Sequence, residues 1–152
     1  MCLADINIAP LESLLGNYQL KLVLVPDCAA IPGSFWGEPE AGLIGSCVYA
    51  RPDTPVHSIL HEAAHLIVLS PERRARVHTD ATDSIEEEDA ACYLQIMLAK
   101  QLTDVGCDRL MADMDAWGYS FRLGSARAWF EQDAGDARAW LAARKLLPAN
   151  AP

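Results

Sequence analysis

The stretch His61-Glu62-Ala63-Ala64-His65 is an H-E-x-x-H pattern inside an apolar run that covers residues 55–69. Apolar residues recur in this run with the period of a helix, so the sequence predicts a helix there. Two histidines at i and i+4 share one helical face and reach a single Zn²⁺ at about 2.0–2.1 Å. Glu62 points about 100° round the helix from His61, where it can hold a catalytic water. The pattern is typical of zinc hydrolases.

The other residues of this helix predict how it packs. Its apolar stripe consists of Val56, Ile59, Leu60, Ala63 and Ile67. The histidines 57, 61 and 65 recur every four residues and lie nearly opposite that stripe. Because the last turn is apolar on every side, we expect the helix to be covered on both sides, with the histidine face under a second layer. His57 is interpreted as a residue near the helix start that supports the site rather than as a ligand.

Two histidines leave a catalytic zinc site one protein ligand short. In the metzincin pattern the third ligand is a histidine six residues after the second motif histidine, a position that Pro71 occupies here. The remaining common choice is a carboxylate from a following helix. The acidic run Glu86-Glu87-Glu88-Asp89 begins such a helix, which we predict over residues 85–102 with Ser84 before it.

Helical phase ranks the four acidic residues of this run. Glu87 lies on one stripe with Leu98, and Glu86 lies on the neighbouring apolar stripe, so both are expected to point toward the packed side. Glu88 and Asp89 share stripes with polar residues and are expected to face water. We therefore predict Glu87 as the third ligand, with Glu86 as the alternative.

Glu87 has a competing interpretation. With Ser84 it fits the S-x-x-E capping box, in which the glutamate folds back onto the backbone of the N-cap residue. A carboxylate that folds back in this way cannot also reach a metal ion, so the two interpretations exclude each other.

The histidine motif, followed by Glu87-Glu88-Asp89-Ala90-Ala91-Cys92-Tyr93-Leu94, resembles the HExxH plus E-x-x-A-N-x-F-A arrangement of the ImmA/IrrE-type metallo-endopeptidases, which are gluzincin-like. The resemblance covers residues 54–98. It implies a zincin-like fold, with His61, His65 and Glu87 as zinc ligands and Glu62 as general base. Two positions depart from the family pattern: Ala64 stands where glycine is common, and Ala91 replaces the asparagine.

The rest of the chain predicts a single α+β domain over residues 1–152. Strands are expected at residues 18–25 and 43–50, the second either as an edge strand whose free backbone groups can hold an extended peptide or as an ordinary paired strand. Between them, residues 29–42 are rich in Pro and Gly and predict a loop, with Phe35 and Trp36 folded back onto the core. A polar loop is expected at residues 71–83. Short helices are expected at 108–117, 125–134 and 136–147, before a Pro-containing tail at 148–152.

Composition narrows the classes of function. The formal charge is −9, which opposes nucleic-acid binding because that binding depends on Lys and Arg. Five cysteines without C-x-x-C spacing predict neither a disulfide framework nor a cysteine zinc site. The amino terminus lacks the features of a signal peptide and no apolar stretch is long enough for a membrane span, so we expect a cytoplasmic protein without a membrane partner.

The favoured hypothesis is a zinc metallopeptidase that acts on a protein or peptide substrate, with Glu62 as general base. A second donor for the oxyanion is expected from His78, Tyr119 or Arg122, which lie in loops that could close over the site. The alternatives are a catalytically inactive zinc-binding domain that regulates or binds a partner, and a helical interaction protein without metal.

Overall fold

The computed structural model describes residues 1–147, which form an α+β structure with a small sheet. The strands are β1 (Lys21–Leu24), β2 (Gly42–Ile44) and β3 (Cys47–Ala50). A 3₁₀ turn at Leu3–Asp5 precedes the helices α1 (Ile8–Asn17), α2 (Val56–Val68), α3 (Pro71–Arg74), α4 (Ile85–Ala99), α5 (Gly106–Ala116), α6 (Ala126–Gln132) and α7 (Gly135–Ala143). The tail expected at residues 148–152 lies outside the described part of the chain.

The sheet has the strand order β1-β3-β2, with β3 in the centre. β1 pairs with β3 in parallel, whereas β2 and β3 form an antiparallel hairpin. The prediction of one strand over residues 43–50 was wrong, because the chain turns at Gly45, whose φ of +58° suits a residue without a side chain. The strand that leads into α2 is therefore the central strand and not an edge strand.

The outer edge of β2 is occupied by other segments of the chain. The backbone N–H of Leu43 donates to the carbonyl oxygen of Gly33 (3.1 Å), and its own carbonyl accepts from the N–H of Thr79 (3.0 Å). The N–H of Gly45 donates to the carbonyl of Val77 (2.9 Å). The expectation that this hairpin leaves an open edge for an extended peptide is therefore wrong: backbone groups of residues 33 and 77–79 already pair with it.

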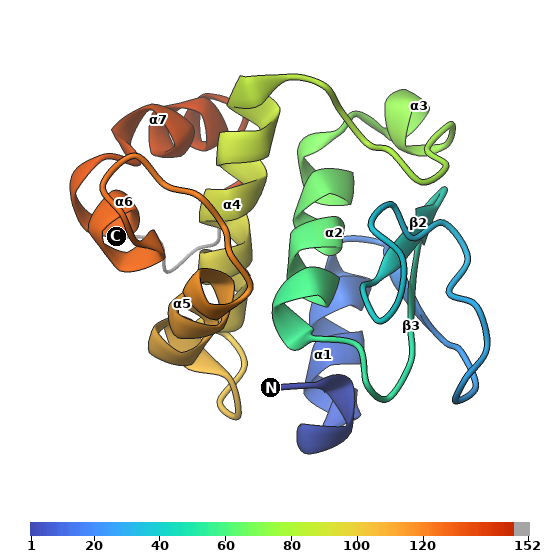
Figure 1. Ribbon diagram of the computed structural model, residues 1–152. Helices are drawn as coiled ribbons and strands as arrows, with labels where there is room; N and C mark the ends of the chain where they lie inside the picture. The colour runs from blue at the N-terminus through green and yellow to red at the C-terminus, as the bar shows by residue number, and fades with distance from the viewer. Residues whose placement is uncertain (148–152) are drawn as a thin grey trace.

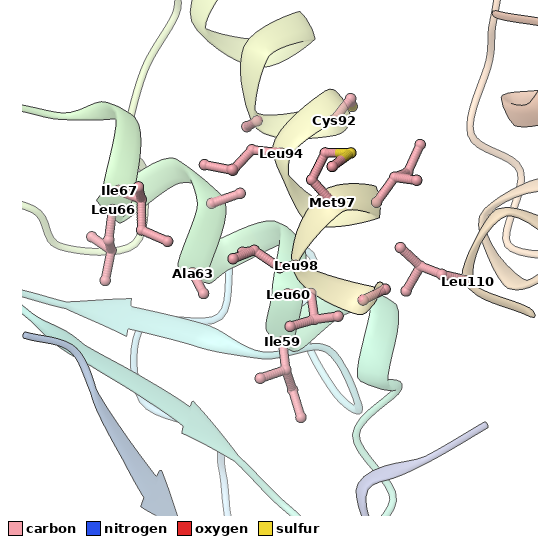
Figure 2. Close-up of a cluster of buried hydrophobic side chains, with 14 of the residues drawn as sticks. Ile59, Leu60, Ala63, Leu66, Ile67, Cys92, Leu94, Met97, Leu98 and Leu110 are labelled. Carbon is pink, nitrogen blue, oxygen red and sulfur yellow. The ribbon is translucent and has the colours of Figure 1, made fainter. Parts of the chain in front are cut away.

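Helices α2 and α4 lie side by side in the middle of the molecule (Figure 1). α2 packs against β2 and β3 on one side and against α4 and α5 on the other, while α4 also contacts α7. Figure 2 shows side chains from α2 and α4, with Leu110 from α5, meeting in this core. The predicted stripe of α2 is buried, and the expectation that both sides of the helix are covered is confirmed.

A loop over residues 25–41 connects β1 to β2. The buried guanidinium of Arg51 fixes it by donating to the carbonyl of Ala29 (2.9 Å) and to the carboxylate of Glu38 (3.0 Å), and it also pairs with Asp53. The aromatic pair Phe35 and Trp36 is 56% and 78% exposed. The prediction that this pair folds onto the core was wrong, and the two rings contact each other at the surface instead.

Within residues 1–147, no helix combines the length and the apolar character that a membrane crossing needs.

Candidate metal centre

The last two turns of α2 present His61 and His65 toward the first turn of α4. The Nε2 atoms of the two rings lie 3.0 Å apart, and the rings meet edge to face with centroids 4.5 Å apart. This placement follows from the i, i+4 spacing on one helical face. The histidine face lies under a second layer, as the sequence predicts, because α4 covers it.

Glu88 is the acidic residue that reaches the histidine pair. Its Oε1 lies 3.3 Å from Nε2 of His61, and its Oε2 lies 3.3 Å from Nε2 of His65. Within residues 1–147, these three side chains form the one group of His, Cys, Asp or Glu whose ligand atoms all lie within 4.8 Å of one another. Burial opposes the charged form of Glu88, but hydrogen bonds to the two histidines outweigh it and hold the pKa of the carboxyl below its usual range.

The structure corrects the prediction that Glu87 joins the histidines. The Glu87 carboxylate accepts hydrogen bonds from the guanidinium of Arg73 on α3 and from the hydroxyl of Thr82. Arg73 lowers the pKa of Glu87, so the carboxylate is held charged and away from the site. The alternative ligand Glu86 is exposed and accepts a hydrogen bond from the Ser84 hydroxyl (2.8 Å).

The capping-box interpretation of Glu87 is half right. The Ser84 hydroxyl accepts from the backbone N–H of Glu87 (3.4 Å), so Ser84 is the N-cap of α4. The backbone N–H of Ser84 donates to the Thr82 hydroxyl (3.1 Å) and not to the glutamate. The first turn of α4 is thus capped by its neighbours in the preceding loop, and the Glu87 side chain is used to hold α3.

Helical phase did not identify Glu88, because α4 is buried on every side after its first turn. Every residue from Ala90 to Ala99 is buried, including Gln95 on the stripe of Glu88, whose amide contacts the sulfur of Met114 (2.9 Å). A helix surrounded by packed elements has no solvent face, so polar residues on a stripe do not mark its direction. Spacing offered one further signal: the E-x-x-A pattern occurs in two overlapping registers, Glu87 to Ala90 and Glu88 to Ala91.

The distances between the three donors fit a tetrahedral metal ion. Bonds of about 2.0–2.1 Å in tetrahedral geometry separate two ligand atoms by about 3.3 Å. The observed separations are 3.0 Å between the two Nε2 atoms and 3.3 Å from each Nε2 to a Glu88 oxygen. Both Nδ1 atoms are buried without a hydrogen-bond partner in the described residues, so the polar contacts of the two rings with Glu88 are made through Nε2. Three donors of this type and spacing could hold a metal ion.

Glu62 lines both cavities that open beside the histidines. One cavity, of about 410 Å³, also contacts Tyr119 and Trp117, and the other, of about 340 Å³, contacts residues 79–83. Burial raises the pKa of the Glu62 carboxyl. Glu62 therefore lies next to the group formed by His61, His65 and Glu88 without belonging to it.

One of the three expected oxyanion donors lies at the site. The Tyr119 ring meets the His61 ring edge to face with centroids 5.6 Å apart, and it lines the larger cavity. Its hydroxyl lies 3.5 Å from Nδ1 of His57, the buried histidine at the start of α2. Burial lowers the pKa of His57 to about 4, so this ring is neutral at neutral pH and supports Tyr119.

The other two expected donors lie elsewhere. His78 pairs with Ile44 at the edge of β2, and its Nδ1 lies 2.9 Å from the Thr79 hydroxyl. Arg122 pairs with Asp133. Neither side chain lines the two cavities beside the histidines.

Sequence reasoning missed several residues at the site. Trp36 and Glu40 from the β1–β2 loop line the larger cavity together with Trp117, which is far from them in the sequence. The buried thiol of Cys92 follows Glu88 by one helical turn, with its sulfur 3.8 Å from Glu88 Oε1. Only Cys92 had a usable signal, its i, i+4 spacing from Glu88.

Comparisons of this chain with protein-family models, with curated proteins and with solved structures find no match.

Proposed function

We propose that this protein is a zinc-dependent peptidase with a zincin-like arrangement of its two central helices. The observation that carries the proposal is the convergence of His61, His65 and Glu88 beside Glu62 at the wall of an open cavity. Two imidazoles and one carboxylate are a donor set of catalytic zinc sites, and three protein donors leave one coordination position open. The substrate class we propose is a protein or peptide.

In this proposal His61, His65 and Glu88 hold Zn²⁺. When bound, the ion supplies Lewis-acid polarisation of the scissile carbonyl and makes water a nucleophile near neutral pH. Glu62 accepts the proton of the attacking water and delivers it to the leaving amine. The Tyr119 hydroxyl donates a hydrogen bond to the oxyanion that develops on the carbonyl oxygen, and His57 orients that hydroxyl.

The cavities on either side of Glu62 provide room for a chain to pass the site. Together they extend from Trp117 and Tyr119 to residues 79–83, so substrate can contact protein on both sides of the scissile bond. We also place the protein in the cytoplasm, where its five unpaired cysteines would stay reduced.

The substitution Glu62→Gln tests the proposal. It removes the proton acceptor and keeps the side-chain volume, so we expect peptide cleavage to be lost while the protein still binds one equivalent of zinc. Cleavage is followed by mass spectrometry on a library of synthetic peptides, and zinc by elemental analysis of the purified protein. Glu12→Gln, an exposed position on α1, is the matched control and should cleave like the wild type. Equal cleavage by wild type and Glu62→Gln would refute the proposed role.

Cys92 favours a second candidate, an inactive zinc-binding domain that binds a regulatory partner. Its sulfur lies 3.8 Å from Oε1 of Glu88, so a small movement of the Cys92 side chain would bring the thiol to the metal. A fourth protein donor would close the open position. Replacing zinc with Co²⁺ distinguishes the two candidates, because a thiolate ligand produces an intense near-ultraviolet charge-transfer band. The peptidase proposal expects no such band and an unchanged spectrum in Cys92→Ser. A band that disappears in Cys92→Ser would support the closed site.

A further inference from the structure

The side chains that line the larger cavity beside Glu62 favour a positively charged ligand. Its walls away from the metal-binding group are Trp36 from the β1–β2 loop, Glu40 from the same loop, and Trp117 from the end of α5. Among the residues that the structure describes, neither Lys nor Arg lines this cavity. A ligand in it therefore meets carboxylates and indole rings, together with the imidazole of His61.

Glu40 is the carboxylate in this cavity that no other role accounts for. Glu62 and Glu88 face the same space, but the proposed chemistry uses both of them. The Glu40 side chain is half-buried and makes no hydrogen bond or close ion pair with the residues that the structure describes, although the charge of His61 acts on it. By contrast, its neighbour Glu38 is held by Arg51. An unpaired, partly desolvated carboxylate in a cavity gains most from a cationic partner.

The two tryptophans strengthen the same preference. Trp36 is 78% exposed and Trp117 is 47% exposed, so two large rings border the cavity without being covered by the protein. The face of an indole attracts a cation, and it attracts guanidinium more often than ammonium because the planar group also stacks on the ring. Carboxylate and indole faces together match the side chain of arginine.

We propose that this pocket, formed by Trp36, Glu40 and Trp117, binds a basic side chain of the substrate next to the scissile bond, arginine in preference to lysine. The inference rests on the proposed peptidase function, because Glu62 and Glu88 on the wall of the same cavity place the bond to be cleaved beside the pocket. The smaller cavity, which Glu62 also lines, adds Asp80 and Asp83, and its lining among the described residues contains no Lys or Arg. An acidic segment is disfavoured on both sides.

Binding to an inactive variant tests the pocket without requiring cleavage. In the Glu62→Gln background, synthetic peptides of one sequence carry either arginine or its neutral isostere citrulline at a single position, scanned along the peptide. Titration calorimetry measures affinity, and quenching of tryptophan fluorescence reports contact with the indoles. At one position we expect arginine to bind about tenfold more tightly than citrulline, the effect of one charge pair supported by cation–π contact. Adding Glu40→Gln should reduce this ratio to about twofold or less, whereas adding Glu12→Gln should leave it unchanged.

The outcomes separate this inference from the proposed function. If wild type cleaves peptides but shows no preference for arginine over citrulline, the pocket assignment fails and the peptidase proposal stands. If wild type cleaves nothing, but binding favours arginine and depends on Glu40, the pocket assignment stands and the peptidase proposal fails. Three results would overturn the pocket assignment. They are equal binding of both peptides at every position, an arginine-to-citrulline affinity ratio that Glu40→Gln does not change, and no binding of either peptide.

Discussion

Zinc affinity should depend on Glu88 and not on its neighbour Glu87. The Glu88→Gln substitution keeps the size of the side chain and removes the charge that faces both Nε2 atoms at 3.3 Å. Structural zinc sites with four ligands bind with about 10–16 kcal/mol, which is about 3 kcal/mol per ligand. Losing one ligand of this strength weakens binding by about 100-fold. We therefore expect Glu88→Gln to bind zinc about 100-fold more weakly than wild type.

Glu87→Gln is the matched control, because it makes the same chemical change one residue earlier. Its carboxylate pairs with Arg73, which is half-exposed, so the substitution should change zinc affinity by less than about threefold, within the range of a surface ion pair. Competition against a chromophoric zinc chelator at neutral pH measures both affinities, and circular dichroism verifies that both variants fold. Tight zinc binding by Glu88→Gln together with weak binding by Glu87→Gln would refute the assignment and restore the prediction from helical phase.

Three other substitutions test the site and the fold. Tyr119→Phe should lower kcat by about 100-fold or more, the usual effect of losing one oxyanion donor, without changing zinc affinity. Steady-state kinetics measures kcat and the chelator assay measures zinc affinity. An unchanged kcat would show that the hydroxyl has no role. Leu98→Ala truncates a fully buried side chain between α2 and α4 and should reduce the free energy of unfolding by about 3 kcal/mol. Urea titrations measure this loss, and a loss below about 1 kcal/mol would contradict the packing described. Gly42→Ala should destabilise the protein by about 1–3 kcal/mol, because the new Cβ would lie 2.1 Å from the carbonyl oxygen of Pro32. Thermal melts measure this loss. Gly16→Ala is the control, because no atom of a neighbouring segment lies within 4 Å of its added Cβ.

The helices of this protein were largely predictable from sequence. The helix predicted over residues 55–69 is α2. Its apolar stripe is buried because apolar residues spaced at the 3.6-residue period share one face of the helix, and that face packs into the core. Ser84 marked the start of α4, since a serine hydroxyl satisfies a free N–H of the first turn. α1 was not among the helices predicted above, although Asn7, whose side chain accepts from the N–H of Ala9, marks its start in the same way.

The donor pair on α2 was predictable because both histidines belong to one helix and their spacing alone fixes their geometry. The carboxylate was harder to identify, because its position depends on how α4 is rotated against α2, a property of packing between elements. The polar residues on its stripe misled the assignment, since Gln95 is buried beside Met114 instead of facing solvent. The Arg73 partner of Glu87 was also invisible, because the contact joins two helices across a loop.

The loops contributed most of what sequence could not show. Exposed Trp36 had no periodic context to indicate which way it points, and a tryptophan in a short Pro- and Gly-rich segment is packed inward in many proteins. The hairpin turn is different, because Gly45-Ser46 interrupts the apolar run over residues 43–50 and is a local turn signal that the prediction of one strand passed over. Only the position of Trp36 depends on contacts that the local sequence does not indicate.

The backbone pairing along the outer edge of β2 has a consequence for motion in this protein. Residue 33, which precedes Trp36 and Glu40, and residues 77–79, which precede Asp80 and Asp83, are both fastened to the same short strand. Local unfolding of β2 would therefore release both segments, which lead into residues that line the two cavities. Conditions that stabilise the sheet should for this reason also slow the exchange of molecules between solvent and the cavities.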